Sequence, residues 1–345
     1  MFSKMSFSQP VVSRVFGYSV FLTLNTMLLM SGCQSPPVRQ EPTAVSIARA
    51  TLPSPPPPAR LQFSEEILKL QIFLEGKDFG PGLVDGRKGS FTNKVLRAYE
   101  SLHGPVLTTD FQSITPYTSY KIREEDLARI GKMGSSPQQI ALQRNQPYTE
   151  LIAFISERYH TSRAFLREIN PAVDFSLLHA GDSVRVPNVS APFRIENYSA
   201  AAKTPPDHFR KNRSIQVDTQ ARLLKVLNGD QPIALFPITP GSSDLPAPPG
   251  TWIIRGIVAM PWYRYDAGML NHGIRTKNFY MLPPGPRSPV GILFAGINKP
   301  GIGIHGTGNP ETIGRSASHG CIRLSNWDAA RFRELVTVGN TVIIR

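Results

Sequence analysis

Near Ser214 the spacing of apolar residues changes from a helical to an alternating pattern, and this change separates two kinds of structure in the 345-residue chain. The alternating runs are residues 215–217, 223–227, 233–238, 251–258 and 341–344. Asn228-Gly229, between two of these runs, favours a β-hairpin. Residues 328–336 carry the apolar face of one helix. The sequence therefore predicts a mainly β, β-sandwich-like domain over residues 211–345, within a multidomain α+β protein.

Residues 61–135 contain helical stretches on both sides of a glycine-rich turn. This arrangement resembles the small helical peptidoglycan-binding domain. The matching residues are Leu70-Gln71, Gly76, Val84-Asp85-Gly86, Gly89, Thr92 and Tyr99. A generic helical hairpin accounts for the same spacing and is the alternative.

Residues 145–190 predict a second small unit, with two amphipathic helices followed by a short strand. Ser162 is positioned to cap the second of these helices. The end of the unit, residues 180–187, is similar to a LysM module, a family that binds N-acetylglucosamine polymers. The opening Gly-Asp-Thr of that family is absent here, so a structural spacer is the alternative.

The first 32 residues predict a secretory signal, because Lys4 and Arg14 accompany an apolar run that ends in small residues. The following Cys33 makes the segment resemble a bacterial lipoprotein signal, in which that thiol receives a diacylglyceryl group and the chain is cut before it. A single transmembrane anchor is the alternative, although the run is shorter than the about 20 residues that a span needs. Either way we expect an exported protein of the cell envelope, attached to the outer membrane if the organism has one.

Residues 33–60 are rich in proline, including four in succession at 55–58, and predict an extended linker. The net charge is +13, and residues 1–32 hold only two of the 38 basic residues and no acidic one. The exported part is therefore basic. Anionic membrane surfaces and peptidoglycan are the expected partners, and nucleic acid is not, because an exported protein rarely meets it.

Cys321 is the candidate nucleophile. If Cys33 is lipidated, Cys321 is the one remaining thiol of the two cysteines and has no disulfide partner. His305 precedes it by 16 residues, and a neighbouring imidazole can take the proton of a thiol. Glycines flank both residues, so backbone N–H groups can approach a developing oxyanion. An inert buried cysteine is the alternative.

The sequence around both residues resembles the L,D-transpeptidase (YkuD) family. The matching residues are His305-Gly306-Thr307, Ser318-His319-Gly320-Cys321-Ile322-Arg323-Leu324, Pro248-Pro249-Gly250-Thr251-Trp252, Pro284-Gly285-Pro286 and Ser288-Pro289-Val290-Gly291. The resemblance implies that Cys321 is the nucleophile and His305 the base, with its ring oriented by the carbonyl of Gly306. It also implies an oxyanion hole formed by N–H groups around His319, Gly320 and Cys321. Members of the family cut peptidoglycan stem peptides before a terminal D-alanine and transfer the acyl group to an amine, in wall cross-linking or protein attachment.

Three further residues are candidates for substrate binding, namely Ser318, Arg315 and Arg323. A guanidinium can hold a substrate carboxylate, and Arg323 can do so in a bidentate manner. For Arg315 a solvated loop charge is the alternative. His319 can instead serve a structural role through a ring hydrogen bond.

Neither a metal ion nor a cofactor is expected. A zinc site made of His305, His319 and Cys321 lacks a further ligand, and the G-x-G-x-x-G spacing from Gly301 to Gly306 is followed by no helix. Two other functions stay open: a hydrolase (L,D-carboxypeptidase or amidase) that uses the same site with water as acceptor, and a wall-anchoring lipoprotein with an idle catalytic fold. The intact histidine–cysteine pair favours an enzyme.

Overall fold

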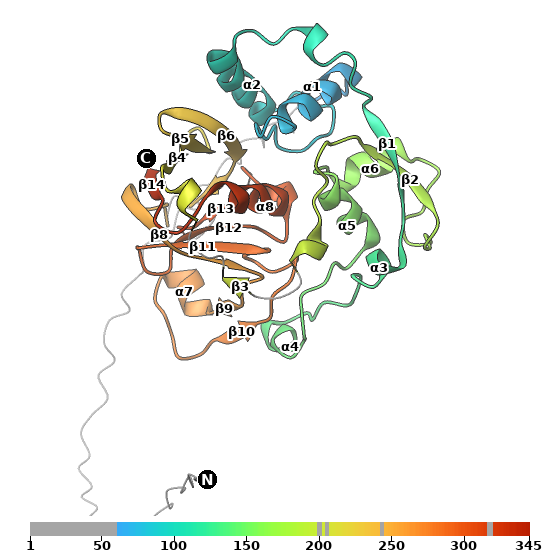
Figure 1. Ribbon diagram of the computed structural model, residues 1–345. Coiled ribbons are helices and arrows are strands. Elements are labelled where there is room, and N and C mark those ends of the chain that lie inside the picture. The colour runs from blue at the N-terminus through green and yellow to red at the C-terminus, as the bar shows by residue number, and fades with distance from the viewer. Residues whose placement is uncertain (1–60, 199–201, 204–206, 242–244, 316–319) are drawn as a thin grey trace, which may run out of the picture. The chain divides into compact units, whose positions relative to one another are not determined.

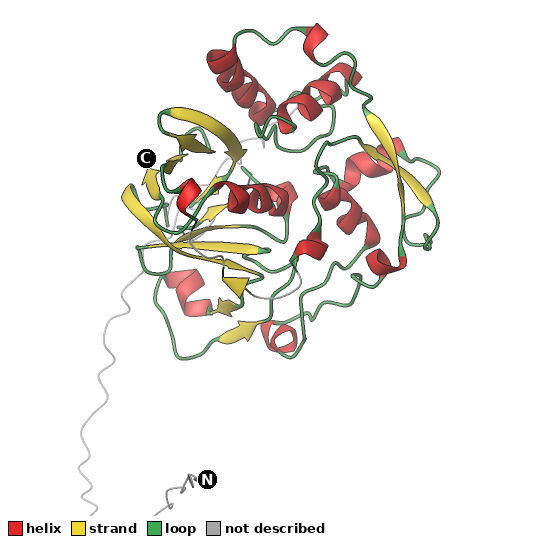
Figure 2. Cartoon of the chain, in the orientation of Figure 1, coloured by secondary structure: helices red, strands yellow, loops and turns green. Residues whose placement is uncertain are grey.

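The computed structural model describes residues 61–198, 202–203, 207–241, 245–315 and 320–345 (Figure 1). The predicted signal, Cys33, the linker, Ser318 and His319 lie outside the described residues. Within the described ranges, no helix has the length and apolar character needed to span a bilayer. Figure 2 shows strands concentrated in the C-terminal part of the chain and helices in the N-terminal part.

The C-terminal part is built on a mixed sheet, in the strand order β6-β5-β4-β14-β8-β11-β12-β13-β7, with β3 paired to β8. The strands are β3 (Ala202–Lys203), β4 (Arg213–Asp218), β5 (Leu223–Asn228), β6 (Gln231–Pro237), β7 (Thr239–Pro240), β8 (Gly250–Ala259), β11 (Leu293–Ile297), β12 (Gly303–His305), β13 (Ile322–Arg323) and β14 (Thr341–Ile344). β4–β14 and β12–β13 are parallel pairs, and the other pairs of this sheet are antiparallel. The predicted mainly β fold of this part is confirmed.

The predicted hairpin is present, but its turn lies one residue further along the chain. Asn228 still pairs with Gln231, so the two loop residues are Gly229 and Asp230. Gly229 has φ +59°, in the left-handed region that a β-branched residue avoids. A register shift between Val226 and Leu227 adds an irregularity to this hairpin.

The predicted C-terminal helix is α8 (Asn326–Leu335), which begins two residues before the predicted start. Ser325 caps it, because its Oγ accepts a hydrogen bond from the backbone N–H of Asp328 at 3.1 Å. Two polar residues in the first turn, Asn326 and Asp328, left this start unmarked by the apolar pattern. This start brings Asn326 into the helix as its first residue, a position that matters for the site described below.

The predicted helices near the start of the described residues are α1 (Glu65–Glu75) and α2 (Ser90–His103). A buried glutamine organises the turn between them. Gln71 Oε1 accepts from the N–H groups of Asp85 and Gly86 at 2.9 and 2.8 Å, and its Nε2 donates to Thr92 Oγ1 at 3.2 Å. Polar residues that match the peptidoglycan-binding domain thus form one hydrogen-bonded network, which fixes the turn between α1 and α2.

The next unit joins segments that are far apart in sequence. β1 (Tyr117–Lys121) pairs antiparallel with β2 (Ser183–Pro187), and α5 (Leu151–Arg158) and α6 (Arg163–Ile169) lie between them in the chain. The predicted cap of α6 is present, since Ser162 Oγ accepts from Phe165 N at 3.0 Å. β1 lies within residues 61–135, the predicted helical domain, whereas its partner β2 lies within residues 145–190, the predicted LysM-like module. The predicted domain boundaries stay predictions.

The remaining short elements of the described chain are η1 (Thr108–Asp110), α3 (Glu124–Leu127), α4 (Pro137–Ala141), η2 (Ile195–Asn197), η3 (His208–Arg210), β9 (Tyr263–Tyr265), α7 (Ala267–His272), β10 (Tyr280–Leu282) and η4 (Pro310–Thr312). β9 and β10 form a separate two-stranded antiparallel sheet.

Candidate active site

The sheet register brings His305 and Cys321 to one face. β12 and β13 run parallel, with Ile304 opposite Ile322 and His305 opposite Arg323. Successive side chains of a strand point to opposite faces. Cys321 directly precedes β13, so it shares a face with Arg323 and therefore with His305. The 16-residue spacing thus corresponds to two neighbouring strands, β12 and β13, of which β12 lies next to β11 (Figure 1).

The other face of these strands is part of the hydrophobic core. Its residues on β8, β11, β12 and β13 are Ile257, Ala295, Ile304 and Ile322, which neighbour one another in the ladder and are at most 1% exposed. Burying these side chains fixes the register, because a one-residue slip would turn them to solvent. The core therefore determines which face carries the histidine and the thiol.

His305 is buried and held in one orientation. Its Nδ1 lies 2.6 Å from the carbonyl oxygen of Gly306, which can only accept a hydrogen bond. Nδ1 therefore carries the proton, and Nε2 is left as the basic nitrogen. Burial is the main cause that lowers the pKa of His305 to about 4, so the ring is neutral at pH 7. On the same face, the ring of Phe294 stacks on it at a centroid distance of 6.0 Å.

The thiol of Cys321 is partly exposed and donates to the carbonyl of Gly301 at 3.5 Å. Burial raises its pKa above the ordinary 9.0, against the opposing effects of a backbone hydrogen bond at Gly303 and the charge of Arg323. The two groups on this face are consequently a neutral thiol and a neutral imidazole in the resting protein.

Two polar side chains share this electrostatic environment. Arg323 is partly buried, and burial lowers its pKa while Tyr263 and Cys321 act in the opposite direction. Burial also raises the pKa of Tyr263, which is coupled to the charges of Cys321 and Arg323. Tyr263 belongs to β9, outside every motif that the sequence analysis used. Its place beside the thiol depends on the fold, and no local pattern signalled it.

Two glycines near the thiol and the histidine cannot be replaced without cost. Gly320, directly before Cys321, has φ +93°, a conformation that residues with a Cβ rarely adopt. Gly306 has an ordinary conformation but no room, because a Cβ there would lie under 3.0 Å from Oδ1 of Asn326. The backbone therefore passes close to other groups at both residues.

Comparison with known proteins agrees with this geometry. The family model of the L,D-transpeptidase catalytic domain matches residues 212–344. A protein of Fuscovulum blasticum, described as a candidate L,D-transpeptidase, is 33% identical over 142 residues, which cover 39% of this chain and 72% of that protein. This chain belongs to the L,D-transpeptidase family. The candidate L,D-transpeptidases YkuD of Bacillus licheniformis and Bacillus subtilis are also similar. The first is 26% identical over 195 residues, 56% of this chain and 93% of the relative. The second is 27% identical over 190 residues, 55% and 90%.

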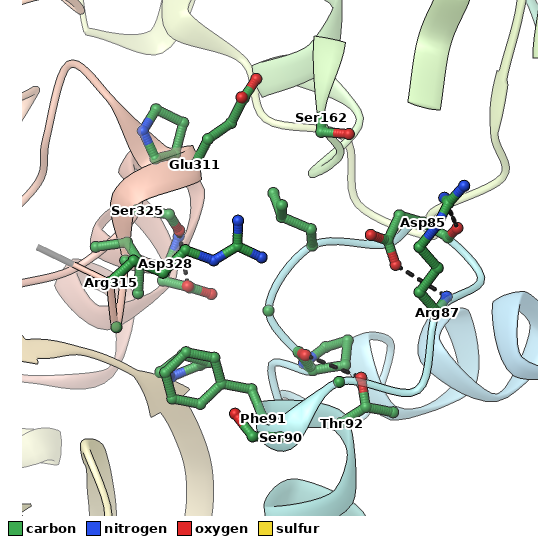
Figure 3. A pocket seen from close by; sticks show the side chains of 18 of the residues that line it. Asp85, Arg87, Ser90, Phe91, Thr92, Ser162, Glu311, Arg315, Ser325 and Asp328 are labelled. Carbon is green, nitrogen blue, oxygen red and sulfur yellow. Dashed lines mark hydrogen bonds between the residues drawn. The ribbon is translucent and has the colours of Figure 1, made fainter. Parts of the chain in front are cut away.

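In this L,D-transpeptidase, Arg315 does not line the same site as His305 and Cys321. It lines a cleft of about 1130 Å³ whose walls come from the α1–α2 turn, α6 and the residues around η4. Figure 3 shows Arg315 and Asp85 on opposite walls of this cleft. The residues that line it do not include His305, Cys321 or Arg323, so the structure does not bring Arg315 together with them.

No group of three or more histidine, cysteine or acidic side chains that could hold a metal ion occurs among the residues that the structure describes.

Proposed function

We propose that the protein is an L,D-transpeptidase that acts on peptidoglycan stem peptides, with Cys321 as nucleophile and His305 as general base. The observation that carries this proposal is the hydrogen bond between His305 Nδ1 and the Gly306 carbonyl. It leaves Nε2 unprotonated on the face that also carries the thiol. A base needs this tautomer to accept a proton from sulfur.

The reaction begins with transfer of the thiol proton to Nε2 of His305 as the sulfur attacks the carbonyl carbon before the terminal D-alanine. Backbone N–H groups around Gly320 and Cys321 stabilise the oxyanion that forms. The carbon–nitrogen bond then breaks, the imidazolium returns its proton to the amine of D-alanine, and a thioester remains on Cys321. An acceptor amine attacks this thioester, His305 takes the proton of the amine, and the released thiolate takes it back.

Arg323 supports the donor side of this proposal. It lies opposite His305 in the ladder and on the face of Cys321, so its guanidinium can hold a carboxylate of the stem peptide. Burial of the guanidinium strengthens such a contact, because less water competes for the charge.

The decisive test is mass spectrometry of a disaccharide-tetrapeptide after incubation with the full-length protein. We expect dimers that have lost one D-alanine, and no product with Cys321→Ala or His305→Gln. Tripeptide without dimer would identify water as the acceptor and the protein as a hydrolase. No product from the unaltered protein, on stem peptides or with added protein acceptors, would favour a wall-anchoring role.

The proposal extends to the cell envelope. The basic and apolar residues before Cys33, together with the positive charge of the remaining chain, support an exported lipoprotein held in a membrane by lipid. The unit with α1 and α2 and the LysM-like unit would then bind the wall near the substrate. Loss of membrane association in Cys33→Ser, and retention of the purified protein on isolated sacculi, are the expected results. A Cys33→Ser protein that stays in the membrane would contradict the lipid anchor.

A further inference from the structure

Asn326 lies directly against the backbone that orients the catalytic histidine. It is fully buried at the start of α8, and its Oδ1 fills the space that a Cβ on Gly306 or on Gly291 would need. Gly306 is the residue whose carbonyl accepts the hydrogen bond from His305 Nδ1. A side chain packed this closely limits the rotation of the Gly306 peptide group.

The amide of Asn326 is fixed by hydrogen bonds on both of its ends. Its Oδ1 accepts from the backbone N–H of Ile292 at 3.1 Å, and its Nδ2 donates to the carbonyl of Pro286 at 3.0 Å. The second Nδ2 hydrogen bond, at 2.9 Å, goes to Oε1 of Glu157. The donors and acceptors around it allow one orientation of the amide.

Glu157 comes from α5, 169 residues earlier in the chain. It is 2% exposed, and its Oε2 accepts from the hydroxyl of Tyr148. A buried carboxyl is costly unless it is hydrogen-bonded, and here both oxygens have partners. α5 thus supplies a rigid acceptor to a residue of the catalytic domain.

We propose that Asn326, held by Glu157, is a positioning residue for His305. Asn326 fixes the peptide group of Gly306, and that group fixes the ring, so the LysM-like unit contributes to the geometry of the base. The inference rests on the proposed function, in which His305 accepts the proton of Cys321. The N–H of Gly306, which belongs to the preceding peptide group, is held separately by the carbonyl of Leu293 at 3.1 Å. Loss of the Asn326 amide therefore loosens the backbone at Gly306 while this hydrogen bond to β11 stays in place.

The test compares four variants of the full-length protein. Asn326→Ala removes the amide, and Glu157→Leu removes its acceptor. Glu157→Gln retains an oxygen that can accept from Asn326, so it serves as the conservative rescue. Arg331→Gln is the matched control, because it breaks the ion pair of α8 with Asp78 (2.6 and 2.7 Å) and leaves the surroundings of Asn326 intact.

Two readouts separate positioning from general loosening. The first is kcat and KM for D-alanine release. The second is ¹⁵N NMR of the His305 ring, assigned by its loss in His305→Gln, which reports the tautomer without requiring turnover. For Asn326→Ala we expect kcat to fall by about ten- to a hundredfold with little change in KM, since small displacements of a catalytic group cost this much. The ring should change from one tautomer to a mixture.

Glu157→Leu should give a smaller loss in kcat, because Asn326 keeps two of its three hydrogen bonds. Glu157→Gln and Arg331→Gln should retain the kcat and the ring signals of the unaltered protein. The inference is wrong if Asn326→Ala keeps both kcat and a single tautomer, or if Arg331→Gln lowers kcat as much. If Asn326→Ala does not fold, Glu157→Leu against Glu157→Gln decides. An unaltered protein without turnover would refute the proposed function, whereas the tautomer measurement would still test the positioning.

Discussion

The reactivity of Cys321 towards iodoacetamide should rise with pH throughout the neutral range. Only the thiolate reacts, and burial raises the pKa of this thiol above 9.0. Two pH units below 9.0, at most about 1% of the sulfur is thiolate. The alkylation rate at pH 7 should therefore be no more than about one-hundredth of its plateau, and it should increase about tenfold per pH unit up to pH 9.

Peptide mapping by mass spectrometry measures the alkylation of Cys321 on its own peptide, apart from any reaction elsewhere in the chain. Arg323→Gln should move the profile to higher pH, because the positive charge of Arg323 lowers the pKa of the thiol. Arg315→Gln is the matched control, since Arg315 lies in the separate cleft, and it should leave the profile unchanged. A plateau already reached below pH 7 would show a thiolate–imidazolium pair in the resting enzyme. That result would refute the argument from burial.

Three further changes have outcomes that follow from packing and burial. Gly306→Ala should destabilise the protein by about 1–3 kcal/mol and abolish D-alanine release, because the new Cβ collides with Asn326; unchanged thermal unfolding would contradict this. Ile322→Ala should cost about 2–5 kcal/mol in urea unfolding, since the side chain is 0% exposed, and a loss below 1 kcal/mol would mean that this face is not core. Burial raises the pKa of Glu157 from 4.5 to about 7, so the folded state binds this proton more tightly than the unfolded state. The contribution of this proton to the free energy of unfolding is therefore full below pH 4.5 and lost as the pH rises to 7. Glu157→Gln should remove this pH dependence, which amounts to up to about 3 kcal/mol between pH 4.5 and 7 in urea unfolding.

The residues around the thiol could be identified from sequence because they lie close together in the chain. His305 ends β12, Cys321 precedes β13, and these two strands are direct neighbours in the sheet. The contact between the histidine ring and Gly306 involves consecutive residues. Local spacing and alternation therefore contain most of the information about this face.

Contacts between distant segments could not be predicted in the same way. The strand β1 has one buried side chain, Tyr120, so no apolar alternation marks it, and its partner β2 is more than 60 residues away. Glu157 reads as part of an amphipathic helix until the fold brings Asn326 to it. Tyr263 likewise reaches the site through the tertiary structure. Burial of polar groups between segments is a property of the assembled core, and a sequence pattern does not report it.

The position of β14 has a consequence for the order in which the chain is assembled. β14 follows every other described strand in sequence, yet in the sheet it lies between β4 and β8. The ladder from β4 through β14 to β8 therefore forms only once residues 341–344 have been synthesised. A chain that stops before Thr341 would leave the edges of β4 and β8 open, with backbone groups available to pair with other chains.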